Sequence, residues 1–316
     1  MQKEVHNRRT RVLFLLIVLL LLPALLINLD LMTFIEDESI RALVALEMMY
    51  SGDYITPTLN GELYYNKPPL YNWILILFYH LGGEVSEWMS RLPTVLSLLG
   101  FAATIYYFGR RHFSRYAALV QALALITCGR ILFWDSMLGL IDTFFSWLMF
   151  LLFMVVYHLY GKRKNYPLFL AAYFLASAGF LLKGLPALVF LGITLLVQFI
   201  GRRAFWKLIS LPHLAGFGLF VLLCGAYYAA YAEQNSLDQV FVTLLSESTK
   251  RTVVEYGWGE VVQQILLFPL EMSYHFLPWT LLLVYLFWKR SWTRLRKHDF
   301  SRYALQVFFF NILLYW

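Results

Sequence analysis

Apolar stretches, separated by short polar segments, recur along the whole chain. A transmembrane helix needs about 20 consecutive apolar residues, and most of these stretches approach that length. They cover residues 12–29, 91–109, 116–134, 137–160, 167–182, 185–200, 211–231 and about 269–288, with a last one that begins at 303. The pattern predicts an all-α polytopic membrane protein, with eight or nine transmembrane helices in one membrane domain that covers residues 1–316.

Two shorter stretches lie between the first and second predicted spans. Residues 38–50 place their apolar side chains on one face of a helix, as amphipathic helices at a membrane surface do. Residues 70–81 are apolar but too short to cross a bilayer. We therefore expect two amphipathic juxtamembrane helices inside a first extracytoplasmic loop at 30–90, and a later extracytoplasmic loop at 232–268.

The basic residues predict the orientation of the chain. Nineteen of the 26 Lys and Arg residues fall in five clusters beside the predicted spans. The clusters are residues 3–11, 110–115, 162–164, 202–207 and 289–302. They share one side of the membrane only if 70–81 does not cross, and the positive-inside rule makes that side cytoplasmic. We expect an integral protein of a bacterial cytoplasmic (inner) membrane, surrounded by membrane lipids.

Composition supports this class and excludes others. Hydrophobic residues make up 60% of the chain and charged residues only 14%, against about a quarter charged in soluble domains. The net charge of +7 comes from clusters between spans, so no nucleic-acid partner is expected. Of the 19 Asp and Glu residues, only Glu4 and Asp299 lie on the predicted cytoplasmic side. An enzyme that uses carboxylates beside a phosphate-binding cation has this distribution, and so does an ordinary solvated surface.

Two motifs in the first outer loop carry charges that chemistry can use. The stretch IEDES places three acids, Asp37 and Glu38 among them, at the start of a predicted helix. Acids there stabilise the helix dipole, or one of them serves as a general base or metal ligand. In YYNKPPLYNW, Lys67 precedes two prolines, which a first helical turn tolerates and which hold the lysine in a rigid corner. A lysine that only snorkels to the headgroups needs no such rigidity.

Three further charged residues lie beside apolar stretches. Asp135 and Asp142 lie near the outer end of the predicted hairpin between the third and fourth spans, and an intramembrane carboxylate is functional by default. Asp135 follows Arg130 by five residues and is the stronger candidate, whereas Asp142 is also suited to a structural role. Lys183 lies between two apolar stretches and either snorkels or contacts a phosphate.

The first outer loop resembles a known family. The sequence DESIRALVALEMMYSGDYITPTLNGELYYNKPPLYNW contains, in order, an acidic pair, Glu-Met, Ser-Gly-Asp-aromatic, Asn-Gly and Lys-Pro-Pro-Leu. It is similar to the first loop of lipid-linked-sugar glycosyltransferases of the GT-C superfamily, the protein O-mannosyltransferases and bacterial relatives such as the aminoarabinose transferase of lipid A. The later stretches GRILFWDSML, LLKGLPAL and FLPWTLLL resemble further motifs of this family in the same order.

The resemblance implies a GT-C-like helix bundle with its active site at the outer face, under juxtamembrane helices. Asp37 and Asp135 match the catalytic aspartate of the first loop and the aspartate of the second. Lys67 and Arg251 match residues that contact the phosphate of the lipid-linked donor. Further candidate substrate-binding residues are Glu38, Arg41, Lys183 and Asp142.

The same resemblance bears on cofactors. In the aminoarabinose branch, an acid that binds a metal precedes the lysine, and a histidine follows a second Glu. Here these positions are Asn66 and Ser248, the latter directly after Glu247. No cofactor is assigned from the sequence, and a divalent metal held in part by Glu247 stays open.

The implied function is the inverting transfer of one monosaccharide from an undecaprenyl- or dolichyl-phosphate donor to a lipid, glycan or protein acceptor at the outer face. Intramembrane charges also mark transporters and lipid flippases, but we identify in the sequence neither the inverted repeats nor the broken midplane helices that many transporters have. A third interpretation is an inactive fragment of such a transferase. The chain stops at NILLYW inside an apolar stretch, where members of the family continue with further helices and often an outer domain.

Overall fold

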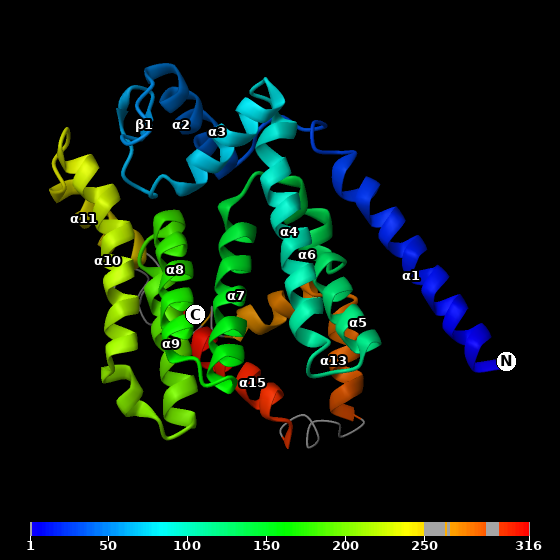
Figure 1. Cartoon of the computed structure of the whole chain (residues 1–316). Coiled ribbons are helices and arrows are strands. Elements are labelled where there is room, and N and C mark those ends of the chain that lie inside the picture. Colours follow the sequence, from blue (N-terminus) through cyan, green and yellow to red (C-terminus); the bar gives the residue numbers. More distant parts are fainter. Residues whose placement is uncertain (1, 250–262, 264–265, 289–296, 316) are drawn as a thin grey trace.

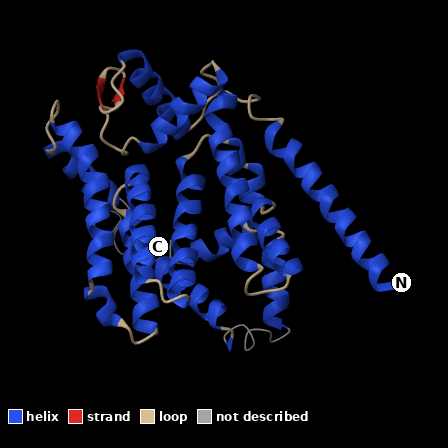
Figure 2. Ribbon diagram, viewed as in Figure 1, coloured by secondary structure: helices blue, strands red, loops and turns tan. Residues whose placement is uncertain are grey.

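The computed structural model describes residues 2–249, 263, 266–288 and 297–315. These residues are largely helical, with one short antiparallel hairpin formed by β1 (Thr58–Leu59) and β2 (Glu62–Leu63) (Figure 2). The helices are α1 (Gln2–Leu26), α2 (Asp37–Ser51), α3 (Leu70–Gly82), α4 (Glu87–Gly109), α5 (Arg115–Ile126), α6 (Gly129–Phe133), α7 (Ile141–Gly161), α8 (Asn165–Lys183), α9 (Pro186–Gly201), α10 (Leu211–Ala232), α11 (Asp238–Thr249), α13 (Trp279–Trp288) and α15 (Asp299–Tyr315). Two 3₁₀ helices follow α6 and α9, at Asp135–Met137 and Phe205–Ile209.

The long helices form a bundle with two different ends (Figure 1). Helices α4, α7, α8, α9 and α10 run side by side, and α2, the hairpin and α3 lie across one end, here named the α2/α3 end. The loops after α4, α7 and α9 all lie at the opposite end, here named the basic end, and carry the clusters at 110–115, 162–164 and 202–207. These three clusters therefore share one end because α3 does not run through the bundle. Which end faces the cytoplasm stays a prediction.

Within the part of the chain that the structure describes, four helices are long and apolar enough to cross a membrane, namely α4, α7, α8 and α10. A fifth span results if α5 and the segment Gly129–Met137 count as one, although they meet at a bend of 45°. Among the described residues, shorter apolar helices lie at Leu15–Leu26, Leu70–Gly82 and Pro186–Gly201. The predicted total of eight or nine spans stays a prediction.

Two predicted spans are wrong as continuous helices. The stretch 116–134 breaks after α5, and the stretch 269–288 is helical at 266–275 and again in α13, with a break between them. The two breaks contact each other: Gly129 donates its amide to the carbonyl of Leu277 (2.8 Å), and the Trp279 indole donates to the Thr127 hydroxyl (2.9 Å). Amides and carbonyls freed from one helix are thus satisfied by the other segment, which is what a break at membrane depth requires.

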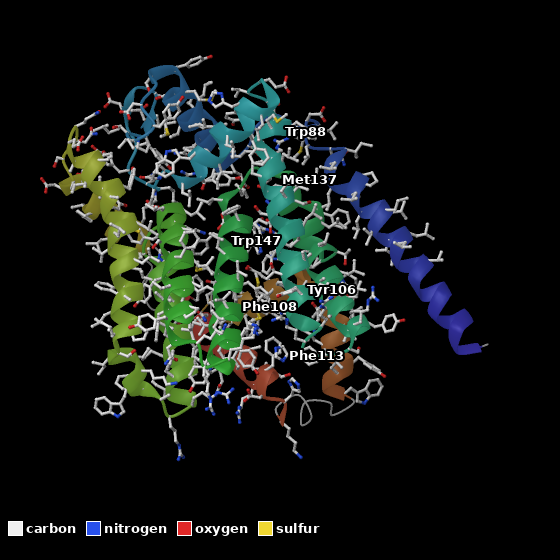
Figure 3. The ribbon with its side chains drawn as sticks, in the orientation of Figure 1. Trp88, Tyr106, Phe108, Phe113, Met137 and Trp147 are labelled. Carbon is white, nitrogen blue, oxygen red and sulfur yellow. The ribbon has the colours of Figure 1, made fainter. Side chains whose placement is uncertain are left out.

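Close helix contacts build the core between α7, α8 and α10. Gly216 of α10 lies so near α8 that a Cβ atom added there would be 2.5 Å from the Tyr173 ring and 2.9 Å from the Phe169 carbonyl oxygen. Small residues at such crossings let helix backbones approach. On the other side, Trp147 of α7 points toward α4 (Figure 3) and donates its indole N–H to the Thr104 hydroxyl at 2.9 Å.

Helix α3 is fixed to the bundle by one face. Tyr71, Leu75 and Tyr79, spaced four residues apart, are each about 1% exposed, as a helical stripe at i, i+4 and i+8 predicts. The phenol groups of Tyr71 and Tyr79 share hydrogen bonds with Thr94 (3.3 Å) and Ser90 (2.6 Å) of α4. The position of the segment just before α3 is therefore tied to the position of α4.

Candidate active site

The loop between α2 and α3 folds around the carboxylate of Glu47. Glu47 accepts hydrogen bonds from the Thr58 hydroxyl (2.7 Å) and from the amides of Asn60 (2.6 Å) and Gly61 (3.3 Å). Burial alone raises the pKa of Glu47, but these hydrogen bonds outweigh it and lower the pKa below its usual value. Asn60 and Gly61 both have positive φ angles, of 55° and 80°, as a two-residue hairpin turn needs. The loop is thus a rigid platform.

The platform leads to Lys67 and is anchored on the bundle. The Trp73 indole of α3 donates to the Tyr54 carbonyl (2.6 Å), and the Tyr227 hydroxyl of α10 donates to the Ile55 carbonyl (3.1 Å). Helix α3 begins at Leu70 with Pro69 as its N-cap. The prediction that the prolines lie within the first helical turn is therefore wrong by one residue, although Lys67 is still held directly before the helix.

Asp37 is the first residue of α2, at the α2/α3 end. Its side chain is exposed, and its carboxylate makes no hydrogen bond to another described residue. The preceding residue, Glu36, has a φ of 52°, a conformation that is unfavourable for a residue with a side chain. The chain thus turns sharply into α2 and leaves the Asp37 carboxylate free at the positive end of the helix dipole.

Glu38 has a different environment from its neighbour. Its carboxylate forms a two-fold ion pair with Arg91 of α4, at 2.6 and 3.0 Å, and also accepts the amides of Ile35 (2.9 Å) and Gly139 (2.7 Å). Glu38 and Arg91 are 1% and 0% exposed. All the usual acceptor positions of the carboxylate are used within the protein. Glu38, a candidate substrate ligand by sequence, is therefore a structural residue in this structure.

Arg41 lies one turn after Asp37 and is 3% exposed. Its guanidinium stands over the Tyr64 ring, 5.3 Å from the ring centre, and its Nε has no hydrogen-bond partner. No ion pair joins Arg41 to a carboxylate within the described part of the chain. A buried cation without a counter-charge is unfavourable, so this position suits a group that receives an anion.

Lys67 faces the same region. Its Nζ is 3.2 Å from a carboxylate oxygen of Glu247 in α11, and the two side chains are only 17% and 18% exposed. Burial lowers the pKa of Lys67 and Glu247 raises it, while the nearby positive charges of Arg41 and Lys183 lower it further, so that the pKa lies below that of an ordinary lysine. The positive charges of Arg41 and Lys183 are thus near enough to Lys67 to lower its pKa.

Lys183 is the last residue of α8, and its positive charge acts on Lys67. It is hydrogen-bonded to Asp142 at the start of α7, and its amine lies 5.5 Å from the centre of the Phe145 ring. Gly184 follows with a φ of 78°, and a Cβ atom there would meet Leu244 of α11 at 2.9 Å. The turn that positions Lys183 thus requires glycine for both conformation and space.

The structure gathers most of the predicted site at the α2/α3 end. The gathered residues are Asp37, Arg41, Lys67, Asp142, Lys183 and Glu247. Asp135 instead pairs with Arg130 at 2.9 Å, and no described interaction links it to Lys67 or Arg41. Arg251 lies outside the described residues.

Sequence reasoning missed Tyr64, whose ring centre lies 5.3 Å from the Arg41 guanidinium. It is 8% exposed. Burial raises its pKa, Arg41 lowers it, and the charges of Asp37 and Glu247 raise it, with a net increase. The signal was available, because Tyr64 lies three residues before Lys67 in the stretch that resembles the family. Its hydroxyl can donate a hydrogen bond to an anion held by the two cations.

The described residues do not fit a metal site. They contain no group of three or more His, Cys, Asp or Glu side chains close enough to hold a metal ion. Glu247, the one residue left open for this role, is paired with Lys67, and Asn66 is a neutral amide.

These features define a helical integral membrane protein with a cationic site beneath short helices at one end of the bundle. Residues 66–228, just over half of the 316, match the model of the family described as dolichyl-phosphate-mannose-protein mannosyltransferase. The chain belongs to this family. The predicted resemblance to GT-C glycosyltransferases is thereby confirmed.

Two relatives are similar to parts of this chain. An uncharacterized protein of Aquifex aeolicus (strain VF5) is 25% identical over 253 residues, which are 80% of this chain and 49% of that protein. A second uncharacterized protein of the same organism is 36% identical over 87 residues, 28% of this chain and 21% of its own.

The fold is similar to that of ArnT from Cupriavidus metallidurans. The crystal structure of ArnT bound to undecaprenyl phosphate superposes with a TM-score of 0.75 at 24% identity, over 94% of this chain and 53% of that one. The apo structure gives a TM-score of 0.68 at 23% identity, over 95% and 53%. The predicted all-α, GT-C-like membrane bundle is confirmed. The chain spans about half the length of ArnT and of the longer Aquifex match.

Proposed function

We propose that the chain transfers one sugar from a polyprenyl-phosphate carrier to an acceptor hydroxyl at the outer face of the cytoplasmic membrane. The observation that carries the proposal is the group of three cations at the α2/α3 end, Arg41, Lys67 and Lys183, in which Arg41 is buried without a described carboxylate partner. Such a group suits a ligand that brings negative charge of its own. A lipid phosphate is such a ligand, and ArnT, whose fold is similar, was crystallised with undecaprenyl phosphate.

The reaction is a single displacement at the anomeric carbon. Asp37, exposed at the start of α2, accepts the proton of the acceptor hydroxyl, whose oxygen attacks that carbon. The bond from the sugar to the phosphate oxygen breaks, and its electron pair stays on the lipid phosphate, so the configuration inverts. Arg41 and Lys67 stabilise the charge that grows on the phosphate. Lys67 keeps two N–H donors for this purpose while its third holds Glu247.

The proposal includes two further residues that are not part of the cluster around Lys67. Arg251 is proposed as a second phosphate ligand on the strength of the family motif. Asp135 is proposed as a second catalytic carboxylate and would act from the segment between α6 and α7. The sugar, the acceptor and the membrane face are part of the same proposal, supported by the family and by the charge distribution.

Donor binding and turnover of two variants test the proposal. Purified full chain is assayed for binding of polyprenyl phosphate and for sugar transfer from polyprenyl-phosphate sugars. Truncating one partner of a buried charge pair costs roughly 2–5 kcal/mol, so Lys67→Ala should weaken binding by roughly thirtyfold or more. Lys67→Arg should bind better than Lys67→Ala but turn over slowly, because a planar guanidinium places the phosphate differently. Asp37→Asn should keep donor binding and lose about 10²–10⁴-fold in rate.

Lys164→Ala is the matched control, since it removes an exposed lysine from the basic end. It should leave both readouts unchanged. Near-normal binding by Lys67→Ala contradicts the phosphate site, and more than about a tenth of the normal rate in Asp37→Asn contradicts general-base catalysis. Binding of polyprenyl phosphate by the unaltered chain without any transfer would make it a lipid-binding or lipid-transporting protein.

A further inference from the structure

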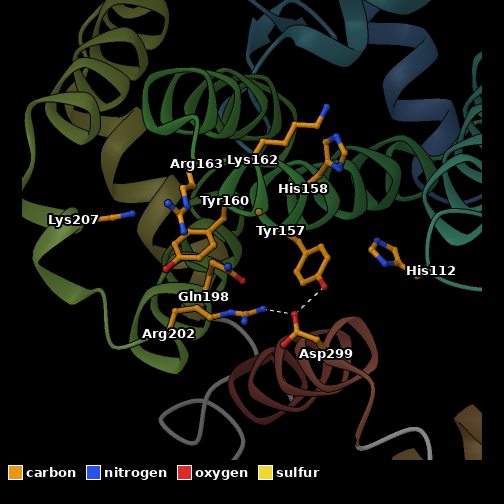
Figure 4. A pocket seen from close by; sticks show the side chains of 11 residues that line it. His112, Tyr157, His158, Tyr160, Lys162, Arg163, Gln198, Arg202, Lys207 and Asp299 are labelled. Carbon is orange, nitrogen blue, oxygen red and sulfur yellow. Dashed lines mark hydrogen bonds and ion pairs between the residues drawn. The ribbon is translucent and has the colours of Figure 1, made fainter.

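A second charged cavity lies at the basic end, far from the cluster of Lys67. It has a volume of about 760 Å³ and lies where α7 and α9 end and α15 begins (Figure 4). Its most charged side is formed by the loop after α7, the loop after α9, and the first residue of α15. The residues used below are Tyr160, Arg163, Gln198, Arg202, Lys207 and Asp299.

The cations of this cavity outnumber its acids. Asp299 is the single carboxylate among the described lining residues. It is already bound by Arg202, by Arg302 at 2.9 Å and by the Tyr157 hydroxyl at 3.0 Å. Burial raises the pKa of Asp299, but these hydrogen bonds and the charge of Arg202 outweigh burial and lower the pKa below its usual value. The carboxylate already has three donors bound to it.

Arg163 and Lys207 therefore have no acid to neutralise them in the described part of the chain. The Lys207 amine lies 5.1 Å from the centre of the Tyr160 ring. Figure 4 shows Arg163 and Lys207 converging on that ring from two different loops. Two cations that approach each other repel, so the arrangement favours an anion between them.

A buried amide points to the same ligand. Gln198 of α9 is 2% exposed, lines the cavity, and its Nε2 has no hydrogen-bond partner. Figure 4 shows the Gln198 side chain next to Tyr160 and Arg202. A buried donor left unpaired is costly. An oxyanion that enters the cavity can accept this N–H together with those of Arg163 and Lys207.

An apolar groove of about 500 Å³ continues along the same two helices. Helix α15 contributes to both spaces: Asp299 lines the cavity, and Gln306, Phe310 and Leu313 line the groove. Successive residues of this set are seven, four and three positions apart, so all four lie on one face of the helix. On α9, Arg202 of the cavity directly follows Gly201 of the groove. A molecule with an anionic head and an apolar tail can therefore occupy both.

We propose that this end of the protein binds an anionic phospholipid of the surrounding leaflet. Its phosphate is held by Arg163, Lys207 and the Gln198 amide, and one acyl chain lies in the groove between α9 and α15. The positive-inside rule accounts for cations in these loops but not for their convergence on a cavity with a buried, unpaired amide. The site is independent of the proposed sugar transfer, since none of its residues belongs to the Lys67 cluster.

The test compares two double variants that remove equal charge from the same two loops. Arg163→Gln with Lys207→Gln alters the cavity, whereas Lys164→Gln with Arg203→Gln alters neighbouring residues that do not line it. Binding of phosphatidylglycerol to the purified full chain in detergent is measured by native mass spectrometry. A hydrogen bond to a charged group is worth roughly tenfold in affinity. The cavity variant should therefore bind at least about tenfold more weakly, and the control should change less than about threefold.

Gln198→Leu tests the amide without changing any charge. It should lower phosphatidylglycerol binding severalfold, while its unfolding temperature in lipid-free detergent should not fall, because an unpaired buried amide is removed. This variant keeps the proposal testable if the double variant fails to fold. Phosphatidylcholine should bind more weakly than phosphatidylglycerol, and soluble glycerol 3-phosphate should not displace the lipid at equal concentration.

Three results would overturn the proposal. Equal losses in the two double variants would mean that only the general positive charge of the loops attracts the lipid. Equal binding of phosphatidylcholine, whose choline offsets its phosphate charge, would mean that the net negative charge of the headgroup is not recognised. Displacement by glycerol 3-phosphate at equal concentration would mean a site for a soluble phosphate compound, with no part for the groove.

Discussion

Replacement of Arg91 by methionine should destabilise the protein more than any exposed charge change. The five N–H groups of Arg91 bind two oxygens of Glu38 and the carbonyls of Leu29 (2.7 Å), Met32 (2.8 Å) and Thr33 (3.1 Å). The variant leaves the Glu38 carboxylate, which is 1% exposed, without its cation. Breaking a buried pair in this way costs about 3–5 kcal/mol, a large share of the roughly 5–15 kcal/mol that stabilises a typical domain.

A second substitution distinguishes buried charge from lost packing. Adding Glu38→Gln to Arg91→Met removes the stranded negative charge while it keeps the size of the side chain. The double variant should therefore be more stable than Arg91→Met alone. Arg130→Met is the matched control, because Arg130 also pairs with an acid, Asp135, but the two side chains are 45% and 21% exposed. An exposed pair is worth only about 0–1 kcal/mol.

The free energy of unfolding is measured by titrating the full chain in mixed micelles with a denaturing detergent and following helix content by circular dichroism. The expected order of stability is unaltered protein, Arg130→Met, double variant, Arg91→Met. Two results would refute the reasoning. One is an Arg91→Met variant within about 1 kcal/mol of the unaltered protein, and the other is a double variant that is less stable than Arg91→Met.

Two further predictions concern topology and pH. Reporters fused after Asn60 and after Gly83, on either side of α3, should be found on the same side of the membrane, and opposite sides would show that α3 crosses. Glu247→Gln removes the carboxylate that raises the pKa of Lys67 against burial. Since the protonated amine binds the phosphate and binding is lost as pH rises through its pKa, the alkaline limb of donor binding should move to lower pH. An unmoved limb, or one moved to higher pH, would contradict the role of Glu247.

The helix bundle could be predicted because its signals are local, whereas the orientation inferred from the basic clusters stays a prediction. Span length, the short apolar stretch at 70–81 and the basic clusters are each contained in about 20 residues, and the membrane imposes the helical state on each stretch separately. The breaks at Thr127 and at Leu277 could not be predicted in this way. They are held by hydrogen bonds between segments about 150 residues apart, and each stretch alone resembles an uninterrupted span.

The same distinction between local signals and long-range contacts applies to the candidate site. Asp37, Arg41 and Lys67 lie in one continuous motif, so the amino-acid sequence alone was enough to place them in one loop and to suggest their chemistry. Spacing alone could not distinguish the adjacent acids Asp37 and Glu38, which only the family resemblance had assigned to different roles. Helix geometry points neighbouring side chains in different directions, and only the packing of α4 shows that Glu38 meets a buried arginine 53 residues later.

Ion pairs seen in the structure also distinguish charged residues for which the sequence suggested similar roles. Glu247 reaches Lys67 over 180 residues, and Lys183 meets Asp142 over 41. Asp135, equal to Asp142 as an acid near a helix end, turns to Arg130 instead. Residue type and local spacing specify which groups can ionise and which stretches form helices. Burial, and hence the partner that each charge needs in a low-dielectric interior, depends on the three-dimensional arrangement of helices distant in sequence.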